Sequence, residues 1–583
     1  MKDDAPLAKH ALLLAAAFAC VYLATSARHF LGGDPGEFAT IAGAGGFAHP
    51  PGYPIYSLYL WLASLLPVSS PAHEAAMATA LLGACAVGLF FLALRAWRVP
   101  PLPATFGAAL FGLAPQVWLL HAIPEAFALN HLLVAAILLF SAPSSVLEGR
   151  KRMVALGLTA AAGIAHHHMI IWMIPVGLYG VWRAIDESDR PPGRTLLTGI
   201  GCLLVGFLPY GYLVWVTRMA PEAYHWREVA NWTDLVDTFL RRDYGTFQLT
   251  LAGDQATALE QITRLGSEVV ADLVFVAPIL GIIGLVILLR RKDAPLAHMS
   301  VIASWLLSGP VFVSMIRRGV GGTDYLHLRK FHTQFEMLTV FFVAVGATWL
   351  ASVISRRWLL GLLLGAVCLA CALVAIPHLD RHTAPTVEHY LEDTFGSLPE
   401  DAVVVGTGDH NFFGANYLQR ALGRRHDIDY VDAYLLAHRW YNLRATDRLD
   451  ISYPYRGSDI DTDRLFERIL ATGRPLFVTG PFHDALLRGW PSSPIGTLIR
   501  IYPKSQPPPH PAAAFEKNRA MLRDFQVTPL PHAPPHTWSR FVLEDYASTW
   551  VSLTAALQQT GHPRLARTSS KIARRFAPWP PTN

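Results

Sequence analysis

The residues of this sequence that are best suited to chemistry lie in short polar motifs beside long apolar runs. The first motif is GGDPGEF at 32–38, which places Asp34 and Glu37 directly after an apolar stretch. A carboxylate can accept the proton of a hydroxyl group that is otherwise a poor nucleophile. Both acids also have a plainer interpretation, as the N-cap and a first-turn residue of a helix. The motif therefore indicates either acid–base chemistry or a capped helix.

Five later segments carry further polar side chains at similar places between apolar runs. They supply imidazole and phenol groups, a third carboxylate and several cations: His49 and Tyr53 in AHPPGYP (48–54), Glu125 in HAIPEAFALNH (121–131), the triple histidine His166, His167 and His168, then Arg241, Arg242 and Tyr244, and finally Arg329. Cationic and imidazole donors can stabilise the charge that develops on a leaving phosphate. The plainer alternatives are a first-turn glutamate, histidines bonded to loop carbonyls, and arginines that anchor lipid headgroups.

The elements that must position these residues follow from the composition, which divides the chain into two parts. Hydrophobic residues make up 52% of the 583 residues and charged residues only 16%, whereas a soluble protein averages about 25% charged residues. Residues 378–583 hold 44 of the 91 charged residues, and residues 1–377 hold the other 47. We therefore expect the first part to lie in a bilayer and the second in water. A net charge of +5 is too small and too dispersed to indicate a nucleic-acid partner.

Apolar runs long enough to cross about 30 Å of hydrocarbon occur throughout residues 1–377. They lie near 8–27, 75–94, 103–121, 126–142, 196–217, 268–289, 296–316, 335–354 and 358–377. The stretch 153–184 is too long for one span, and the positive-inside rule favours two short helices with the histidines at the outer turn. About eleven spans result, with the N-terminus cytoplasmic and the C-terminal part extracytoplasmic. Inside loops then hold 15 Lys and Arg residues and outside loops 10, and the candidate residues share the outer face.

Two alternative interpretations remain, one for the first apolar run and one for the acids and histidines. Residues 8–27 have some features of a signal peptide, but many similar segments follow, which favours an uncleaved first span. The acids and histidines show no recognisable metal-ligand spacing, so we predict no metal, although one Asp, one Glu and the histidines can in principle hold a divalent ion. None of the five cysteines lies in 378–583, so that part contains no disulfide.

Four of the motifs together resemble a family of polytopic membrane proteins. GGDPGEF, AHPPGYPIY, PEAFALN and AHHHM follow one another as in that family. Its bacterial members mostly carry a domain-of-unknown-function name, and its eukaryotic member is a transmembrane protein O-mannosyltransferase acting on plexin-type receptors. The resemblance covers 1–377 and extends into GDHNFFGANYLQ (408–419) and the stretch 427–441. Two departures are Pro35, where a small residue is expected, and Met169, where threonine is expected.

The resemblance implies a fold similar to GT-C glycosyltransferases and inverting transfer of mannose or another hexose from a polyprenyl-phosphate carrier. Asp34 would then be the base, Glu37 its neighbour, and His49 a residue on the phosphate side. The remaining candidates are assigned to substrate binding. No cofactor is implied, and the expected partners are the lipid-linked donor, an exported protein or glycan acceptor, and the bilayer.

The C-terminal part alternates strand and helix patterns, which predicts a small parallel-sheet domain at 378–505. A Pro-rich connector at 506–535 and a helical hairpin at 536–583, similar to one tetratricopeptide unit, follow it. The full expectation is a mainly α, polytopic membrane protein with a C-terminal α/β domain.

The expected function is a membrane glycosyltransferase of the inner membrane, acting on a hydroxyl such as Ser or Thr of exported proteins. The alternatives are transfer to a lipid or cell-wall glycan, a lipid or sugar transporter, and a sensor whose tail binds a ligand. A transporter predicts paired internal repeats with charges at mid-membrane, and the sequence shows no such symmetry. A sensor does not need acids in two separate outer loops.

Overall fold

The computed structural model describes residues 4–66, 68–246, 256–316, 328–479, 487, 489–529 and 537–577. The chain forms two compact units that interleave in sequence. We call Met1–Ala27, Gly45–Ser69 and His73–Asp380 the membrane unit, and Arg28–Ala44, Ser70–Ala72 and Arg381–Asn583 the C-terminal unit. The domain boundary predicted after residue 377 lies beside the division at 380, but the structure also groups 28–44 and 70–72 with the C-terminal residues.

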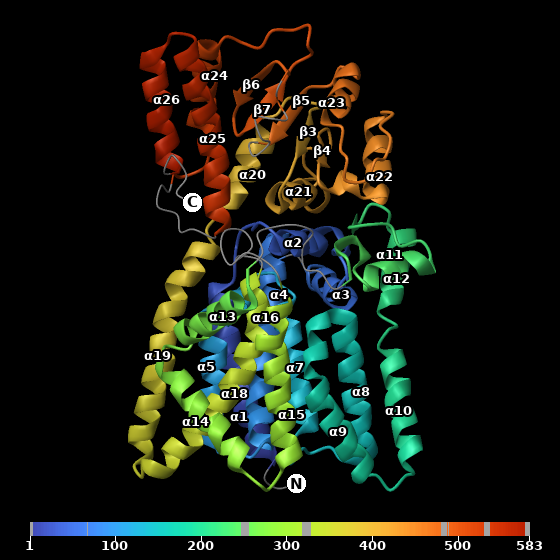
Figure 1. Ribbon diagram of the computed structural model, residues 1–583, viewed down its shortest axis with the longest axis vertical. Helices are drawn as coiled ribbons and strands as arrows, with labels where there is room; N and C mark the ends of the chain where they lie inside the picture. The colour runs from blue at the N-terminus through green and yellow to red at the C-terminus, as the bar shows by residue number, and fades with distance from the viewer. Residues whose placement is uncertain are drawn as a thin grey trace. The chain divides into compact units, whose positions relative to one another are not determined.

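The membrane unit is almost entirely helical (Figure 1). Its elements are α1 (Asp4–Thr25), β1 (Gly46–Phe47), α3 (Pro54–Ala63), α4 (Pro71–Ala96), α5 (Pro101–Leu113), α6 (Pro115–Ala122), α7 (Phe127–Ser141), α8 (Gly149–His166), η1 (His168–Met173), α9 (Ile174–Asp186), α10 (Pro192–Val205), α11 (Tyr210–Met219), β2 (Tyr224–His225), α12 (Trp232–Phe239), η2 (Arg242–Tyr244), α13 (Ala258–Asp272), α14 (Val276–Arg290), α15 (Pro295–Leu306), the π-helical turn η3 (Leu307–Val311), α16 (Phe312–Met315), η4 (Lys330–His332), α18 (Thr333–Val353) and α19 (Arg357–His382).

Among the described residues, seven helices are long and apolar enough to cross a membrane, or up to nine if each of two bent helix pairs is one span. The bent pairs are Pro101–Leu113 with Pro115–Ala122, at 65°, and Ala258–Asp272 with Val276–Arg290, at 112°. The two further spans of the predicted eleven correspond to α7, which is a short apolar helix, and to α8, whose first turn contains three consecutive basic residues. The polytopic, helical class is confirmed, and the number eleven stays a prediction.

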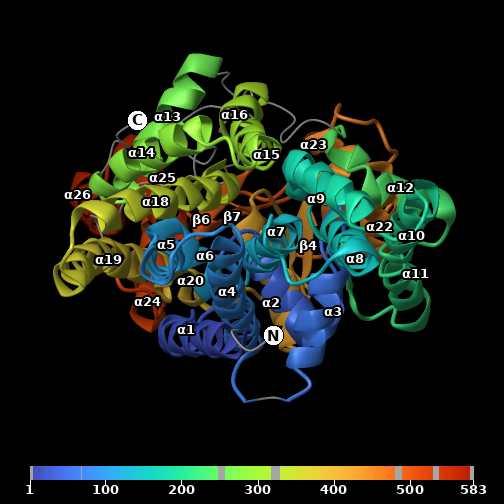
Figure 2. The same ribbon diagram turned by 90° about the horizontal axis from the view of Figure 1, so that it is seen from below.

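The surface of the membrane unit matches a hydrocarbon environment. Figure 2 shows α10 and α19 at the edge of the helix assembly. Leu197 and Leu204 on α10 are each 67% exposed, and Leu362 on α19 is 63% exposed. Rows of exposed leucines on outer helices are unfavourable in water but suited to lipid.

The interior of this unit is tightly packed where α14 crosses α18. A side-chain carbon added at Gly284 would lie 1.9 Å from the carbonyl oxygen of Phe342, and one added at Gly346 would lie 1.9 Å from that of Leu280. The two backbones therefore touch, which is the close approach that small residues permit between membrane helices.

The C-terminal unit is an α/β structure built around one five-stranded sheet with the order β4-β3-β5-β7-β6 (Figure 1). Its elements are α2 (Asp34–Ala44), α20 (Thr386–Gly396), β3 (Val403–Gly406), α21 (Asp409–Asn416), the π-helical turn η5 (Tyr417–Ala421), β4 (Asp429–Asp432), η6 (Leu435–Ala437), α22 (Arg439–Leu449), α23 (Thr462–Ala471), β5 (Leu476–Thr479), β6 (Ser492–Ile495), β7 (Leu498–Ile501), α24 (Pro511–Asp524), α25 (Trp538–Gln559) and α26 (Pro563–Phe576).

Four of the five strands run in one direction, and β7 runs in the opposite direction. Val403 in β3 lies opposite Asp429 in β4 and Leu476 in β5, both in parallel register, while β7 runs antiparallel to β5 and to β6. All four residues of β3 are buried, as expected for an interior strand between two parallel neighbours.

The last part of the chain is more helical than its proline content suggests. The stretch predicted as a connector contains α24, which starts at Pro511, where a missing backbone N–H costs the helix nothing. Residues 530–535 of that stretch lie outside the described part. The helices α25 and α26 then form a hairpin in which Ser569 Oγ donates to the carbonyl oxygen of Trp550 over 2.7 Å.

Candidate functional site

Asp34 and Glu37 lie in the first turn of α2, the acid helix, which belongs to the C-terminal unit. Acidic residues in a first turn are favoured because the helix dipole places positive partial charge there. Pro35 occupies the same turn, where proline is tolerated, so this departure from the family pattern leaves the helix intact. Gly45, with a φ of 71°, follows the last helical residue and supplies a left-handed ending.

The two acids differ in exposure. Glu37 is fully buried, whereas Asp34 is the only residue between Phe30 and Ala42 whose side chain is not buried. A general base must reach its proton donor. Asp34 is therefore the better placed of the two to meet a substrate.

The membrane unit brings several other candidate residues together around Tyr53. The centre of the Tyr53 ring lies 5.3 Å from that of His49, 5.9 Å from that of His166 and 5.8 Å from that of His167. His49 and Tyr53 stand at the two ends of a turn closed by the Gly52 N–H, which donates to the His49 carbonyl over 2.8 Å. Two motifs about 110 residues apart thus meet. We call these four side chains the imidazole cluster.

The three consecutive histidines point in different directions because the backbone changes direction at this place. His166 ends α8, His167 is extended with a φ of −148°, and His168 opens η1. His166 Nε2 donates to the Ala126 carbonyl over 2.8 Å, and the His168 ring contacts Phe239 with ring centres 5.2 Å apart. His167 Nδ1 accepts from the Met169 N–H over 3.1 Å, so the position where threonine was expected contributes its backbone.

Glu125 forms a buried ion pair. Lys330 Nζ lies 3.1 Å from Glu125 Oε1, and the two residues are 8% and 3% exposed. The ammonium group also lies 5.9 Å from the ring centre of Phe127, and that ring is 5.1 Å from the ring of His167. Glu125 therefore adjoins the imidazole cluster and is charge-balanced by a lysine 205 residues away in the chain.

An aromatic group extends the imidazole cluster on its other side. The His49 ring lies 6.0 Å from the Trp226 ring and 6.2 Å from the Tyr244 ring, measured between centres. Trp226 and Tyr244 stack at 6.3 Å, and the guanidinium of Arg241 lies 5.5 Å from the centre of Tyr244. Aromatic faces with a cation at one edge suit a sugar phosphate, whose C–H faces are apolar and whose phosphate is anionic.

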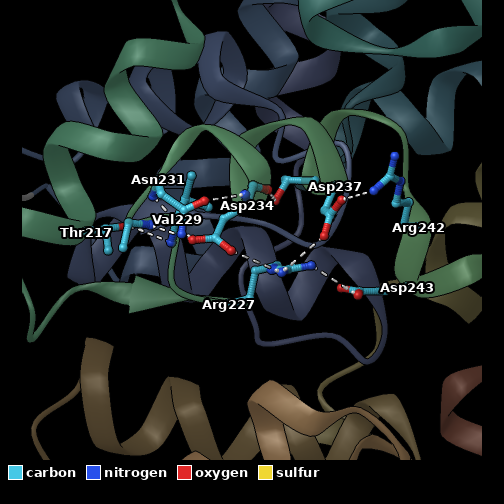
Figure 3. A network of polar contacts seen from close by, with 10 residues as sticks. Thr217, Arg227, Val229, Asn231, Asp234, Asp237, Arg242 and Asp243 are labelled. Carbon is cyan, nitrogen blue, oxygen red and sulfur yellow. Dashed lines mark hydrogen bonds and ion pairs between the residues drawn. The ribbon is translucent and has the colours of Figure 1, made fainter.

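A buried arginine holds this aromatic segment in place (Figure 3). Arg227 lies 3.2 Å from Asp243, 3.7 Å from Asp234 and 3.9 Å from Asp237. Asn231 caps α12, because its side chain accepts the Asp234 N–H and the Asp234 carboxylate accepts the Asn231 N–H. The loop around Trp226 and Tyr244 is therefore fixed by charge pairs in addition to the apolar cluster that contains Ala223, Val229 and Leu235.

Two arginines predicted to bind substrate are engaged in other ion pairs. Arg242 donates to Asp237 over 2.6 Å and is 55% exposed. Arg329 donates to Asp272 over 2.6 Å. Beside it, His332 Nδ1 lies 2.6 Å from Glu268 Oε2. The ion pairs of Arg242 and Arg329 are as consistent with a structural role as with a role in substrate binding.

The structure thus assembles His49, Tyr53, His166, His167, Glu125, Arg241 and Tyr244 within the membrane unit. Trp226 joins them, although sequence reasoning gave it no role in the site, and so does Lys330, one of the outer-loop cations that the sequence placed beside Arg329. A tryptophan in a polar loop and a lysine directly before an apolar helix were the available signals. Within the described residues, no group of three or more His, Cys, Asp or Glu side chains is arranged to hold a metal ion.

Comparison with known proteins agrees with the motifs. Residues 34–188 match the family model of the protein O-mannosyl-transferase TMEM260 N-terminal domain. The resemblance predicted from the motifs is confirmed. The chain is 23% identical to mouse protein O-mannosyl-transferase TMEM260 over 459 residues, which is 73% of this chain and 63% of the mouse protein. It is also 23% identical to the Dictyostelium discoideum relative over 290 residues, 46% of this chain and 35% of that protein. The chain therefore spans less than two thirds of either relative.

The fold agrees with that of two solved structures of one protein. ArnT from Cupriavidus metallidurans, in its structure with bound undecaprenyl phosphate, matches with a TM-score of 0.56 and 15% identity over 85% of this chain and 99% of ArnT. Apo ArnT matches with a TM-score of 0.52 and 16% identity. The expected GT-C-like fold of a multi-pass membrane protein is confirmed.

Proposed function

We propose that this protein is a membrane glycosyltransferase that moves a sugar, mannose or another hexose, from a polyprenyl-phosphate carrier to a hydroxyl acceptor. The observation that carries the proposal is the imidazole cluster with its neighbours Lys330, Trp226 and Tyr244. Imidazoles, an aromatic platform and cations in one place suit a lipid-linked sugar phosphate. The ArnT fold and the TMEM260 relatives support the same class of reaction.

The reaction follows from the proposed roles. The carboxylate of Asp34 takes the proton of the acceptor hydroxyl. At the same time, the hydroxyl oxygen of the acceptor forms a bond to the anomeric carbon of the sugar. The bond from that carbon to the phosphate oxygen breaks, and the electron pair leaves with the polyprenyl phosphate. Cationic and N–H donors stabilise the phosphate charge. Attack opposite the leaving group inverts the anomeric centre.

Three finer assignments belong to the proposal. The reaction takes place on the extracytoplasmic face, in agreement with the distribution of Lys and Arg between the loops. It needs no metal ion, in agreement with the absence of metal-ligand spacing in the acid and histidine motifs. The acceptor is a Ser or Thr hydroxyl of an exported protein.

The test is transfer of radiolabelled sugar from polyprenyl-phosphate mannose or glucose by the purified full-length protein in detergent, with an extracytoplasmic protein extract as acceptor. We expect transfer by wild type, equal transfer after chelation with EDTA, and a loss of about 10²- to 10⁴-fold in Asp34→Asn, because amide cannot act as a base. Asp447→Asn is a matched control, since Asp447 is an exposed acid of the same unit.

Each other outcome contradicts a defined part of the proposal. Absence of transfer from both donors overturns the donor class. Equal activity of wild type and Asp34→Asn removes Asp34 as the base and assigns the role to Glu37. Loss of activity with EDTA overturns the metal-free reaction.

A further inference from the structure

The helix that carries the proposed base is built into the C-terminal unit. Although residues 28–44 are close in sequence to the first transmembrane helix, they cluster with residues after 380, and α2 packs against α21 and η5. One contact is close: a side-chain carbon added at Gly43 would lie 2.7 Å from the Ala421 side chain. The position of Asp34 therefore depends on residues nearly 400 positions away in the sequence.

Trp538 supports the chain directly before Asp34. A side-chain carbon at Gly32 or at Gly33 would lie 2.6 Å from an atom of the Trp538 indole, closer than real side-chain carbons come. Gly33 also has a φ of 73°, which disfavours other residues. The two glycines of the GGDPGEF motif thus let the backbone lie flat on the tryptophan ring.

Trp538 is itself held in place by a polar chain from the hairpin. Its ring centre lies 5.9 Å from that of His410, and His410 Nε2 lies 3.2 Å from Asp545 Oδ2. Asp545 lies two turns after Trp538 on α25, so both contacts to His410 come from one helix. His410 belongs to the GDHN stretch that resembles the family, which gives this motif a role.

A second contact fixes the segment before the glycines. The Phe30 N–H donates to Glu388 Oε2 over 2.5 Å, and His29 Nδ1 lies 3.5 Å from Glu388 Oε1. The ring of Phe30 packs on Tyr417 with centres 4.8 Å apart. Glu388 lies in α20, which follows the last transmembrane helix directly.

We infer that Trp538 and Glu388 are positioning residues for Asp34, so that the C-terminal unit holds the acid helix in place. The inference rests on the proposed function for its effect on rate. A displacement of about 1 Å at a reacting group costs on the order of 10²-fold in rate. Loss of either contact should therefore lower kcat and leave the KM for the lipid-linked donor unchanged.

The experiment compares Trp538→Leu, Gly32→Ala, their double mutant, Glu388→Ala and Glu388→Gln in the transfer assay. Hydrogen exchange of the amides of residues 34–44 is measured in parallel in the full-length protein. Trp490→Leu is the control, because Trp490 is a buried tryptophan of the same unit that donates to Asp463 in α23.

We expect Trp538→Leu and Gly32→Ala each to reduce kcat about 10- to 100-fold and to speed exchange in α2. The double mutant should be less impaired than the product of the two effects, because the smaller leucine makes room for the added methyl group. Glu388→Gln should recover most of the activity lost in Glu388→Ala, since the amide oxygen still accepts the Phe30 N–H. Trp490→Leu should change neither kcat nor α2 exchange.

Failure of this inference can be separated from failure of the proposed function. Unchanged kcat and α2 exchange in Trp538→Leu, with an active wild type, overturns the inference and leaves the transferase standing. A raised KM for the acceptor with unchanged kcat points to an acceptor-binding role and also overturns it. If wild type transfers no sugar, the proposed function fails, and the exchange data alone decide whether these residues hold α2.

Discussion

Two buried acids, one in each unit, illustrate two ways in which this protein accommodates buried charge. In the membrane unit, Glu125 forms an ion pair with Lys330, a residue distant in sequence, and Arg152 pairs with Glu187. In the C-terminal unit, Asp432 at the end of β4 is buried, and no ion pair to it occurs among the described residues. It accepts the Leu435 N–H over 3.0 Å.

The difference between the paired and the unpaired buried acid indicates which carboxylates are available for proton transfer. An acid paired with a buried lysine is held in its charged form, because each partner would be costly to leave alone. Burial, with a smaller contribution from the nearby charge of Asp409, raises the pKa of Asp432 to about 7. Asp34 follows neither pattern, since it is partly exposed at a helix start, and this is the environment in which a base can exchange its proton with a substrate.

The largest stability effect should come from breaking the pair in the membrane unit. Lys330→Met leaves Glu125 buried without its cation, and we expect a loss of about 3–5 kcal/mol in stability. Denaturant titration in mixed micelles measures it. The double mutant Glu125→Gln, Lys330→Met should lose less than the single mutant. Equal losses in the two variants would show that the pair contributes no charge balance, and the comparison between the units would fail.

A smaller effect of opposite sign is expected at Asp432. Its folded pKa of about 7 lies above the value of about 3.9 for an unfolded aspartate. The folded state therefore binds more protons between these values, and stability falls as the pH rises from about 4 to about 7. The full cost, at most about 4 kcal/mol, remains above pH 7.

Asp432→Asn should remove this cost while keeping an oxygen to accept the Leu435 N–H. We expect a higher unfolding temperature of the variant at pH 8 and a difference from wild type that vanishes near pH 4. Thermal unfolding of the full chain between pH 4 and 8 measures both. A variant less stable than wild type at pH 8 would show that Asp432 is charged and paired, as in the membrane unit.

The smallest effect concerns the cap of α12, which lies beside a partly exposed network of charges. Asn231→Ala removes the cap of α12 and should cost about 1 kcal/mol locally. Because the Asp234 N–H would lose the Asn231 side-chain oxygen that accepts from it, we expect faster hydrogen exchange in residues 224–245. Asn416→Ala, on α21 of the other unit, is the control. Unchanged exchange in 224–245 would mean that Arg227 alone fixes the aromatic segment.

Much of the membrane unit could be predicted from the sequence because its signals are local. Apolar runs gave the helices, and the motifs with His49, Tyr53 and His167 gave residues that do meet. The pairing of Arg242 with Asp237 and of Arg329 with Asp272 could not be predicted, because an arginine takes whichever carboxylate the fold brings near it. The divergence of the three histidines also depends on backbone angles that three identical letters do not encode.

The membership of the acid helix in the C-terminal unit is the main feature that sequence reasoning missed. Residues 28–44 follow an apolar helix, so sequence proximity placed them with the membrane part. In the sequence, most of the membrane unit lies between them and their partners, Glu388, Ala421 and Trp538. Packing at such separations leaves no periodic signal, and only the two glycines before Asp34 hinted at a close neighbour.

The contact between α14 and α18 has a consequence for genetic surveys of this protein. Gly284 and Gly346 touch neighbouring backbone directly, so even alanine at either place must separate the two helices. In a saturation library scored by sugar transfer, both positions should tolerate glycine alone and rank with the most sensitive sites of the chain. A map of mutational sensitivity alone would then make the crossing of two helices look like part of a catalytic site.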